Sequence, residues 1–114
     1  GKVYFDLLDA REKNQRDDVV LFRIEQLYPF PAKALFNELK PYAKHAEFFW
    51  CQEEPKNMGA WFSVRDYIQW TLDTLKAKNN KISYIGRSPD ATPATGYAQR
   101  HNSQQQEIIN EVFK

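Results

Sequence analysis

The sequence predicts an α/β fold with three layers, in which a mainly parallel sheet carries helices on both faces. Short apolar, β-branched runs alternate with stretches whose apolar residues recur at helical spacing. The resulting order of helix, strand, helix, strand, helix, strand and helix favours a parallel sheet, because each helix returns the chain to the start of the next strand. With 114 residues and 15% aromatic residues, the chain fits one folded domain, so we expect residues 1–114 to form a single domain.

The first half of the chain contains two predicted helices and one predicted strand. Residues 2–13 have apolar side chains at helical spacing and run into a polar segment. Residues 19–24 form a continuous apolar run, which is typical of a strand covered on both faces of a parallel sheet. Pro31 then fits the first turn of a helix whose shared face is made by Leu35, Leu39 and Tyr42.

The second half repeats the alternation. A strand is predicted over residues 47–52 and is expected to stop at Glu53, Glu54 and Pro55. A helix follows with Trp61, Val64, Ile68, Leu72 and Leu75 on one face, and Trp61 suits either the core or a contact with another domain. The last elements are a strand over 81–86, a loop, and a helix over 96–113 with Ala98, His101, Ile108 and Val112 on its apolar side and a solvated tract of glutamines at 104–106. Three strands are few for such a sheet, so we expect one more strand before Gly1 in a longer parent chain.

Composition and motifs exclude several classes of function. The 16 basic and 15 acidic residues are scattered along the sequence, which predicts no nucleic acid partner and no membrane surface. Cys51 is the single cysteine and is expected to be a core thiol rather than a reactive one. His45 and His101 have no neighbours at metal-ligand spacing, and phosphate-binding and nucleophile motifs are missing. We therefore predict no catalytic residue and no metal site.

The carboxyl ends of the predicted strands carry the candidate site, because ligands of open parallel sheets collect there. Two arginines and the start of the last helix suit a phosphate or carboxylate, since guanidinium groups and backbone N–H groups favour anions. The alternative is that the arginines pair with nearby carboxylates or meet another domain. The candidate residues are Arg23, Glu25, Gln52, Glu53, Glu54, Arg87, Ser88, Thr95 and Gly96.

Several blocks of residues, in order and spread over nearly the whole chain, resemble one family. They are Gly1 to Leu8, Arg23 to Pro29, Trp50 to Pro55, Asn57 to Trp61, Gly86 with Arg87, and Pro93 to Gly96. Together they closely resemble the C-terminal region of the 2-oxoglutarate dehydrogenase E1 family. The related 2-oxoadipate dehydrogenase E1 shares much of the pattern.

The resemblance implies a domain like the transketolase C-terminal domain, attached in the parent to domains that bind thiamine diphosphate and magnesium. The parent would decarboxylate 2-oxoglutarate and succinylate a lipoyl carrier. Its expected partners are the remaining E1 domains, a second E1 subunit and a lipoyl-bearing E2. The resemblance carries no catalytic residue into this chain, so the chain alone is expected to be inactive, with no cofactor of its own. Its place would be the cytoplasm of a bacterium or the mitochondrial matrix of a eukaryote. A regulatory site for an acyl-CoA is the alternative function.

Overall fold

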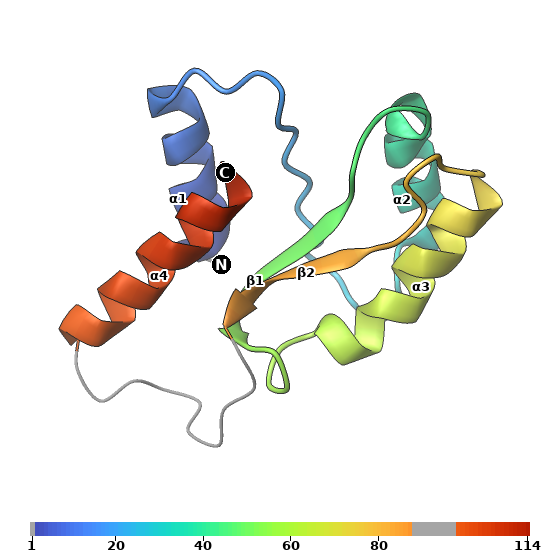
Figure 1. Cartoon of the computed structure of the whole chain (residues 1–114). Coiled ribbons are helices and arrows are strands. Elements are labelled where there is room, and N and C mark those ends of the chain that lie inside the picture. Colours follow the sequence, from blue (N-terminus) through green and yellow to red (C-terminus); the bar gives the residue numbers. More distant parts are fainter. Residues whose placement is uncertain (1, 88–97) are drawn as a thin grey trace. The chain divides into compact units, whose positions relative to one another are not determined.

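We determined the fold from a computed structural model that describes residues 2–87 and 98–114, with the side chains of the last helix described from Gln105 onward (Figure 1). By the contacts among its residues, the chain divides into two compact units. The first unit contains residues 1–23, 51–59 and 85–114, and the second contains residues 24–50 and 60–84. The elements are, in chain order, α1 (Lys2–Lys13), α2 (Ala32–Leu39), the 3₁₀ helix η1 (Lys40–Tyr42), β1 (Phe49–Pro55), α3 (Trp61–Thr74), β2 (Ser83–Arg87) and α4 (Ala98–Val112).

The strands β1 and β2 form a two-stranded parallel sheet, with α3 connecting them along the chain. Beside the start of the pair, the backbone N–H of Ser83 donates to the carbonyl of Phe48 at 3.1 Å. Beyond its far end, the N–H of Lys56 donates to the carbonyl of Arg87 at 3.1 Å. The predicted α/β class is confirmed at this level.

The predicted strand over residues 19–24 is wrong. This segment has no regular secondary structure, and Val20 and Phe22 are 46% and 40% exposed. The carbonyl of Val19 accepts a hydrogen bond of 2.6 Å from Nε of Arg11. A continuous apolar run shows that a segment can be buried, but it becomes a strand only where another strand offers its backbone groups.

The other two strands are confirmed with shifted ends. β1 starts at Phe49 and continues through Pro55, where a stop before Glu53 was expected. Proline is tolerated at the end of a strand, because its missing N–H removes no interior hydrogen bond there. β2 runs from Ser83 to Arg87.

The core of the second unit is formed by α3 lying against α2. Leu72 is fully buried on α3, and Val64 and Ile68 accompany it on the same face. Trp61 is 7% exposed, and its ring lies 5.5 Å from that of Tyr84, so Trp61 belongs to the core. The buried apolar cluster consists of Leu35, Leu39, Ala43, Val64, Ile68, Leu72 and Ala77.

The C-terminus of α3 is closed by a Schellman motif. Lys76 adopts a left-handed conformation with φ of 55°, and its N–H donates to the carbonyl of Asp73 at 3.1 Å. The N–H of Ala77 reaches back to the carbonyl of Leu72 at 3.0 Å. Both bonds satisfy carbonyls that a helix end leaves without intrahelical donors, and the buried pair of Ala77 and Leu72 supplies the accompanying apolar contact.

In the first unit, α1 packs along α4 (Figure 1). The predicted helices at both positions are confirmed. Leu7 of α1 and Ile108 of α4 are buried, at 5% and 3% exposure. α1 ends in a second Schellman motif, in which Gln15 has φ of 52° and the N–H of Arg16 donates to the carbonyl of Arg11 at 3.0 Å. Helical spacing of apolar residues therefore located both helices of this unit.

Candidate functional site

The carboxyl ends of β1 and β2 meet, as the predicted site requires. Gln52, Glu53 and Glu54 lie on β1, and Arg87 is the last residue of β2. The hydrogen bond from the N–H of Lys56 to the carbonyl of Arg87 joins these two ends. Ser88, Thr95 and Gly96 lie outside the described residues, as does the side chain of His101.

Arg23 lies in the irregular segment that follows α1. Its guanidinium carbon is 5.1 Å from the ring centre of Tyr4 and 5.2 Å from that of Phe5. A cation over two aromatic faces is attracted by their negative π surfaces. Arg23 therefore helps to hold this segment against α1, whereas Glu25, predicted for the same site, belongs to the second unit.

The buried side chain of Gln52 braces the turn that follows β1. Gln52 is 4% exposed, and its Nε2 donates to the carbonyls of Glu54 at 3.2 Å and Pro55 at 3.0 Å. Gly59 lies directly against the carboxamide. A Cβ at position 59 would lie 2.6 to 2.7 Å from three atoms of that group. The contacts give Gln52 a structural role at the strand end and explain why residue 59 has no side chain.

Replacing Gly59 with alanine is expected to destabilise the chain by about 1–3 kcal/mol, because the new methyl group displaces the carboxamide of Gln52 from its two carbonyls. Urea unfolding of Gly59→Ala, Gln52→Ala and the double variant measures this. In the Gln52→Ala background the cost of Gly59→Ala should largely disappear. Strictly additive free energies would contradict the contact.

Cys51 precedes Gln52 on β1 and has a thiol that resists ionisation. Burial raises the pKa of the Cys51 thiol from its ordinary 9.0 to about 12, and the carboxylates of Glu111 and Glu53 contribute in the same direction. The thiolate is the nucleophilic form of cysteine. Cys51 is therefore protonated at neutral pH and is not suited to nucleophilic catalysis.

The raised pKa of Cys51 makes the stability of the chain depend on pH. The unfolded chain ionises this thiol above 9.0 and the folded chain only near 12, so the contribution of the neutral thiol is complete below 9.0 and is lost as the pH rises between these values. We expect the free energy of unfolding to fall by about 1 kcal/mol more in the wild type than in Cys51→Ala between about pH 8 and about pH 10. Parallel pH profiles in urea unfolding would contradict this expectation.

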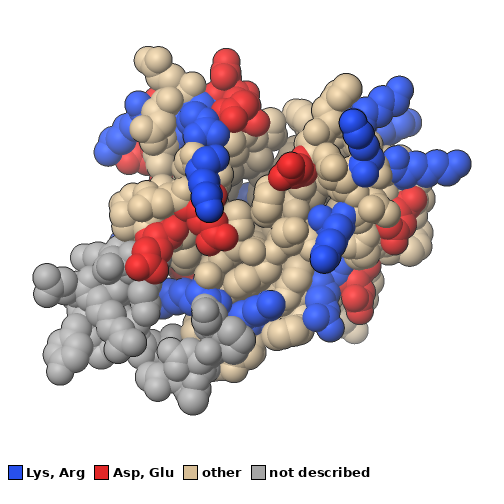
Figure 2. Space-filling model, viewed as in Figure 1, with Lys and Arg blue, Asp and Glu red and all other residues tan. Residues whose placement is uncertain are grey.

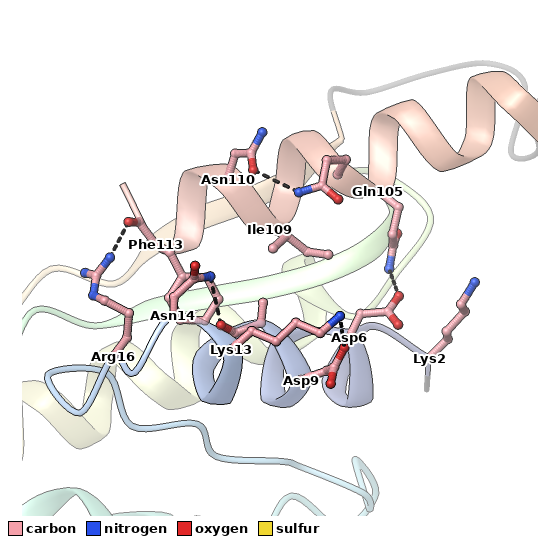
Figure 3. Close-up of a pocket in the computed structure, with 12 residues that line it drawn as sticks. Lys2, Asp6, Asp9, Lys13, Asn14, Arg16, Gln105, Ile109, Asn110 and Phe113 are labelled. Carbon is pink, nitrogen blue, oxygen red and sulfur yellow. Dashed lines mark hydrogen bonds and ion pairs between the residues drawn. The ribbon is translucent and has the colours of Figure 1, made fainter.

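A second hollow, which sequence reasoning missed, lies along α1 and α4 within the first unit. It is a groove of about 690 Å³ (Figure 3). Many of its polar side chains bond within the groove: Nζ of Lys13 is 3.2 Å from Oδ2 of Asp9, and Nε2 of Gln106 donates to Oδ1 of Asn110 at 2.9 Å. Nη1 of Arg16 donates to the carbonyl of Phe113. These contacts hold α1 against α4.

Gln105 is where this groove departs from the prediction of a solvated glutamine tract. Gln105 is 5% exposed, and its Nε2 donates to Oδ2 of Asp6 at 3.2 Å. Its neighbour Gln106 is exposed, as expected. The signal that could have identified Gln105 was its position three residues before Ile108, on the same side of the helix. The hydrogen bond to Asp6 explains how a polar residue occupies this place in the packing.

The described residues 2–87 and 98–114 bring together no group of three or more histidine, cysteine, aspartate or glutamate residues that could hold a metal ion. None of the helices in these ranges is long and apolar enough to span a bilayer.

Comparison with known proteins identifies the family. The model of the family described as 2-oxoglutarate dehydrogenase C-terminal matches residues 1–113. The chain is 56% identical over 104 residues to the 2-oxoglutarate dehydrogenase E1 components of Brucella anthropi and Brucella ovis, which covers 91% of the chain. It spans 10% of the length of these relatives. The two-stranded parallel sheet with its helices thus forms part of a known C-terminal region, and the chain belongs to the 2-oxoglutarate dehydrogenase C-terminal family.

Proposed function

We propose that the chain is the C-terminal structural domain of an E1 subunit that decarboxylates 2-oxoglutarate and succinylates a lipoyl carrier. The match to E1 components supports this function, and it covers most of the chain but only 10% of the relatives' length. In the parent, the sheet would be completed by further strands into a three-layer arrangement like that of the transketolase C-terminal domain. The parent would work in the cytoplasm of a bacterium or in the mitochondrial matrix.

The observation that carries the structural role is the outward side of α3, which we call the aromatic face. It consists of Phe62, Tyr67 and Trp70, which are 48%, 53% and 58% exposed. These positions turn away from the buried face of α3 that packs against α2. Contiguous apolar surface of this kind marks a docking site in a soluble protein. Aromatic residues are also enriched at the centres of interfaces.

The aromatic face is extended and rimmed as an interface would be. The ring of Phe30 stacks on Tyr67 with 4.8 Å between the ring centres and an interplanar angle of 12°. The guanidinium carbon of Arg65 lies 4.9 Å from the ring centre of Phe62. We assign this face to contact with the remaining part of the E1 subunit, because the relatives are about ten times as long as this chain. A second E1 subunit and a lipoyl-bearing E2 complete the proposed assembly.

We assign the thiamine diphosphate and magnesium of the proposed reaction to the remaining domains of the parent. The diphosphate is held through a metal ion, which needs a set of oxygen ligands. The described residues offer no cluster of such ligands, and the thiol of Cys51 is protonated. This chain would therefore position and stabilise the catalytic domains, and it would decarboxylate no 2-oxoglutarate when purified alone.

Substituting the aromatic face tests this role. In the isolated chain, Tyr67→Ser with Trp70→Ser should change the free energy of unfolding little, because each side chain is more than half exposed. In the full-length E1 subunit, the same pair should lower the melting temperature and 2-oxoglutarate decarboxylation together, since a docking surface of the domain is lost. Met58→Ser, which alters a 51% exposed residue of the other unit, is the matched control. Full-length protein that tolerates the pair as well as the control would refute the assignment.

A second candidate function is a regulatory anion site at the strand ends, as predicted for Arg23, Glu25, Gln52, Glu53, Glu54, Arg87, Ser88, Thr95 and Gly96. The observation in its favour is that the backbones of two cationic residues, Lys56 and Arg87, are hydrogen-bonded at the carboxyl ends of the parallel strands. Cationic side chains at such an edge favour phosphate groups, for example those of an acyl-CoA.

Thermal unfolding of the isolated chain with acetyl-CoA tests the anion site. Binding to the folded state should raise the melting temperature in proportion to the ligand's excess over its dissociation constant. Arg87→Ala should remove the shift, whereas the control Arg65→Ala, in the other unit, should retain it. An unchanged melting temperature at saturating acetyl-CoA would exclude the site, and thiamine diphosphate with magnesium should cause no shift.

A further inference from the structure

The structure gathers lysines that the sequence spreads over two separate segments. Residues 40–47 and 73–81 meet where the N–H of Lys78 donates to the carbonyl of Ala43 at 2.9 Å. The two segments contain five lysines and two carboxylates, a net charge of +3, although the whole chain carries only +1. We call this surface the lysine rim, and it consists of the exposed residues Lys40, Lys44, Lys76, Lys78 and Lys81. Figure 2 shows blue side chains gathered over the corresponding end of α2 and α3, at the upper right.

The backbone beneath the lysine rim is held in one conformation. The Schellman motif at Lys76 fixes the start of the turn after α3. Nδ2 of Asn79 donates to the carbonyl of Ala46 at 3.3 Å, and Nδ2 of Asn80 donates to Oδ1 of Asp73 at 3.2 Å. Nε2 of Gln69 donates to the carbonyl of Asn80. Because these bonds order the turn before any partner arrives, binding loses little backbone entropy there.

A groove of about 330 Å³ lies within the lysine rim. One wall is the turn over residues 78–81, and the other contains Glu47, Phe48 and Phe49. The side chain of Phe49 is 51% exposed at the start of β1. The groove therefore combines cations around its edge with an exposed aromatic ring on its wall.

We propose that the lysine rim and its groove bind an acidic segment of a protein partner, with an apolar side chain of that segment lying against Phe49. The carboxylates would meet Lys44, Lys78 and Lys81, and the apolar side chain would cover the ring that is now exposed. The cations attract and orient the segment, while the ring supplies desolvated contact area.

The composition of the groove favours an acidic protein segment over a nucleic acid. Glu47 lines the same groove as Lys78 and Lys81, so it repels a continuous phosphate backbone. A peptide can place a neutral or hydrogen-bonding residue opposite Glu47 and its carboxylates opposite the lysines. The small net charge of +1 of the whole chain also gives a nucleic acid little long-range attraction.

The test measures binding of a fluorescent peptide that contains several glutamates around one leucine, by anisotropy with the whole 114-residue chain. The matched peptide has glutamine in place of each glutamate. The rim variant combines Lys44→Glu, Lys78→Glu and Lys81→Glu. The control variant combines Lys2→Glu, Lys33→Glu and Lys114→Glu, which changes the net charge equally at exposed positions outside the rim.

The acidic peptide should bind the wild type and the rim variant with affinities that differ by about tenfold or more, because three attractive charges become repulsive. The control variant should keep most of the affinity, and added salt should weaken binding by screening. Phe49→Ala should also weaken binding with its salt dependence unchanged, since it removes only the apolar contact. No binding of the acidic peptide, equal losses in the rim and control variants, equal binding of the glutamine peptide, or tighter binding of a single-stranded oligonucleotide would each overturn the proposal.

Discussion

Burial of one face of α3 is the interaction on which the described surfaces depend. Val64, Ile68 and Leu72 are removed from water against α2, and burying a side chain of this size contributes about 1.5–3 kcal/mol. A helix with one side buried must present its other side outward, which places Phe62, Tyr67 and Trp70 on the surface. The N-terminal residue of α3, Trp61, packs against Tyr84 of β2. One buried stripe thus fixes both an outward face and the contact at the start of the helix.

Much of this fold could be predicted from the sequence, because helical spacing and buried helical faces are local properties. All four helices and the two strands of the sheet were located by their patterns. The segment over residues 19–24 was not, because a strand exists only if its backbone finds a partner, and a single run of residues cannot show whether one is present. Pro55 likewise reads as a strand stop in the sequence but ends β1 from within.

The candidate site was predicted less completely than the fold. The strand-end principle brought β1 and Arg87 together, but it gave Gln52 a ligand-binding role, whereas its carboxamide bonds to the following turn. The burial of Gln105 depends on Asp6, a residue 99 positions away. The lysine rim depends on a hydrogen bond between Lys78 and Ala43, which are also distant in sequence. Contacts of this range leave no periodic signal, so the charges appeared scattered. The E1 family was recognised from blocks of residues instead.

The conformation of Lys76 bears on which side chains the turn after α3 can carry. A left-handed backbone costs a residue with a Cβ about 1 kcal/mol relative to glycine, so glycine would be the more stable choice at this position. The chain carries a lysine there instead, and its exposed ammonium group lies among the other lysines of the rim. A strained position occupied by a charged residue is a sign of selection for the side chain rather than for the backbone. The helix stop of α3 is therefore also a place where stability has been exchanged for surface charge.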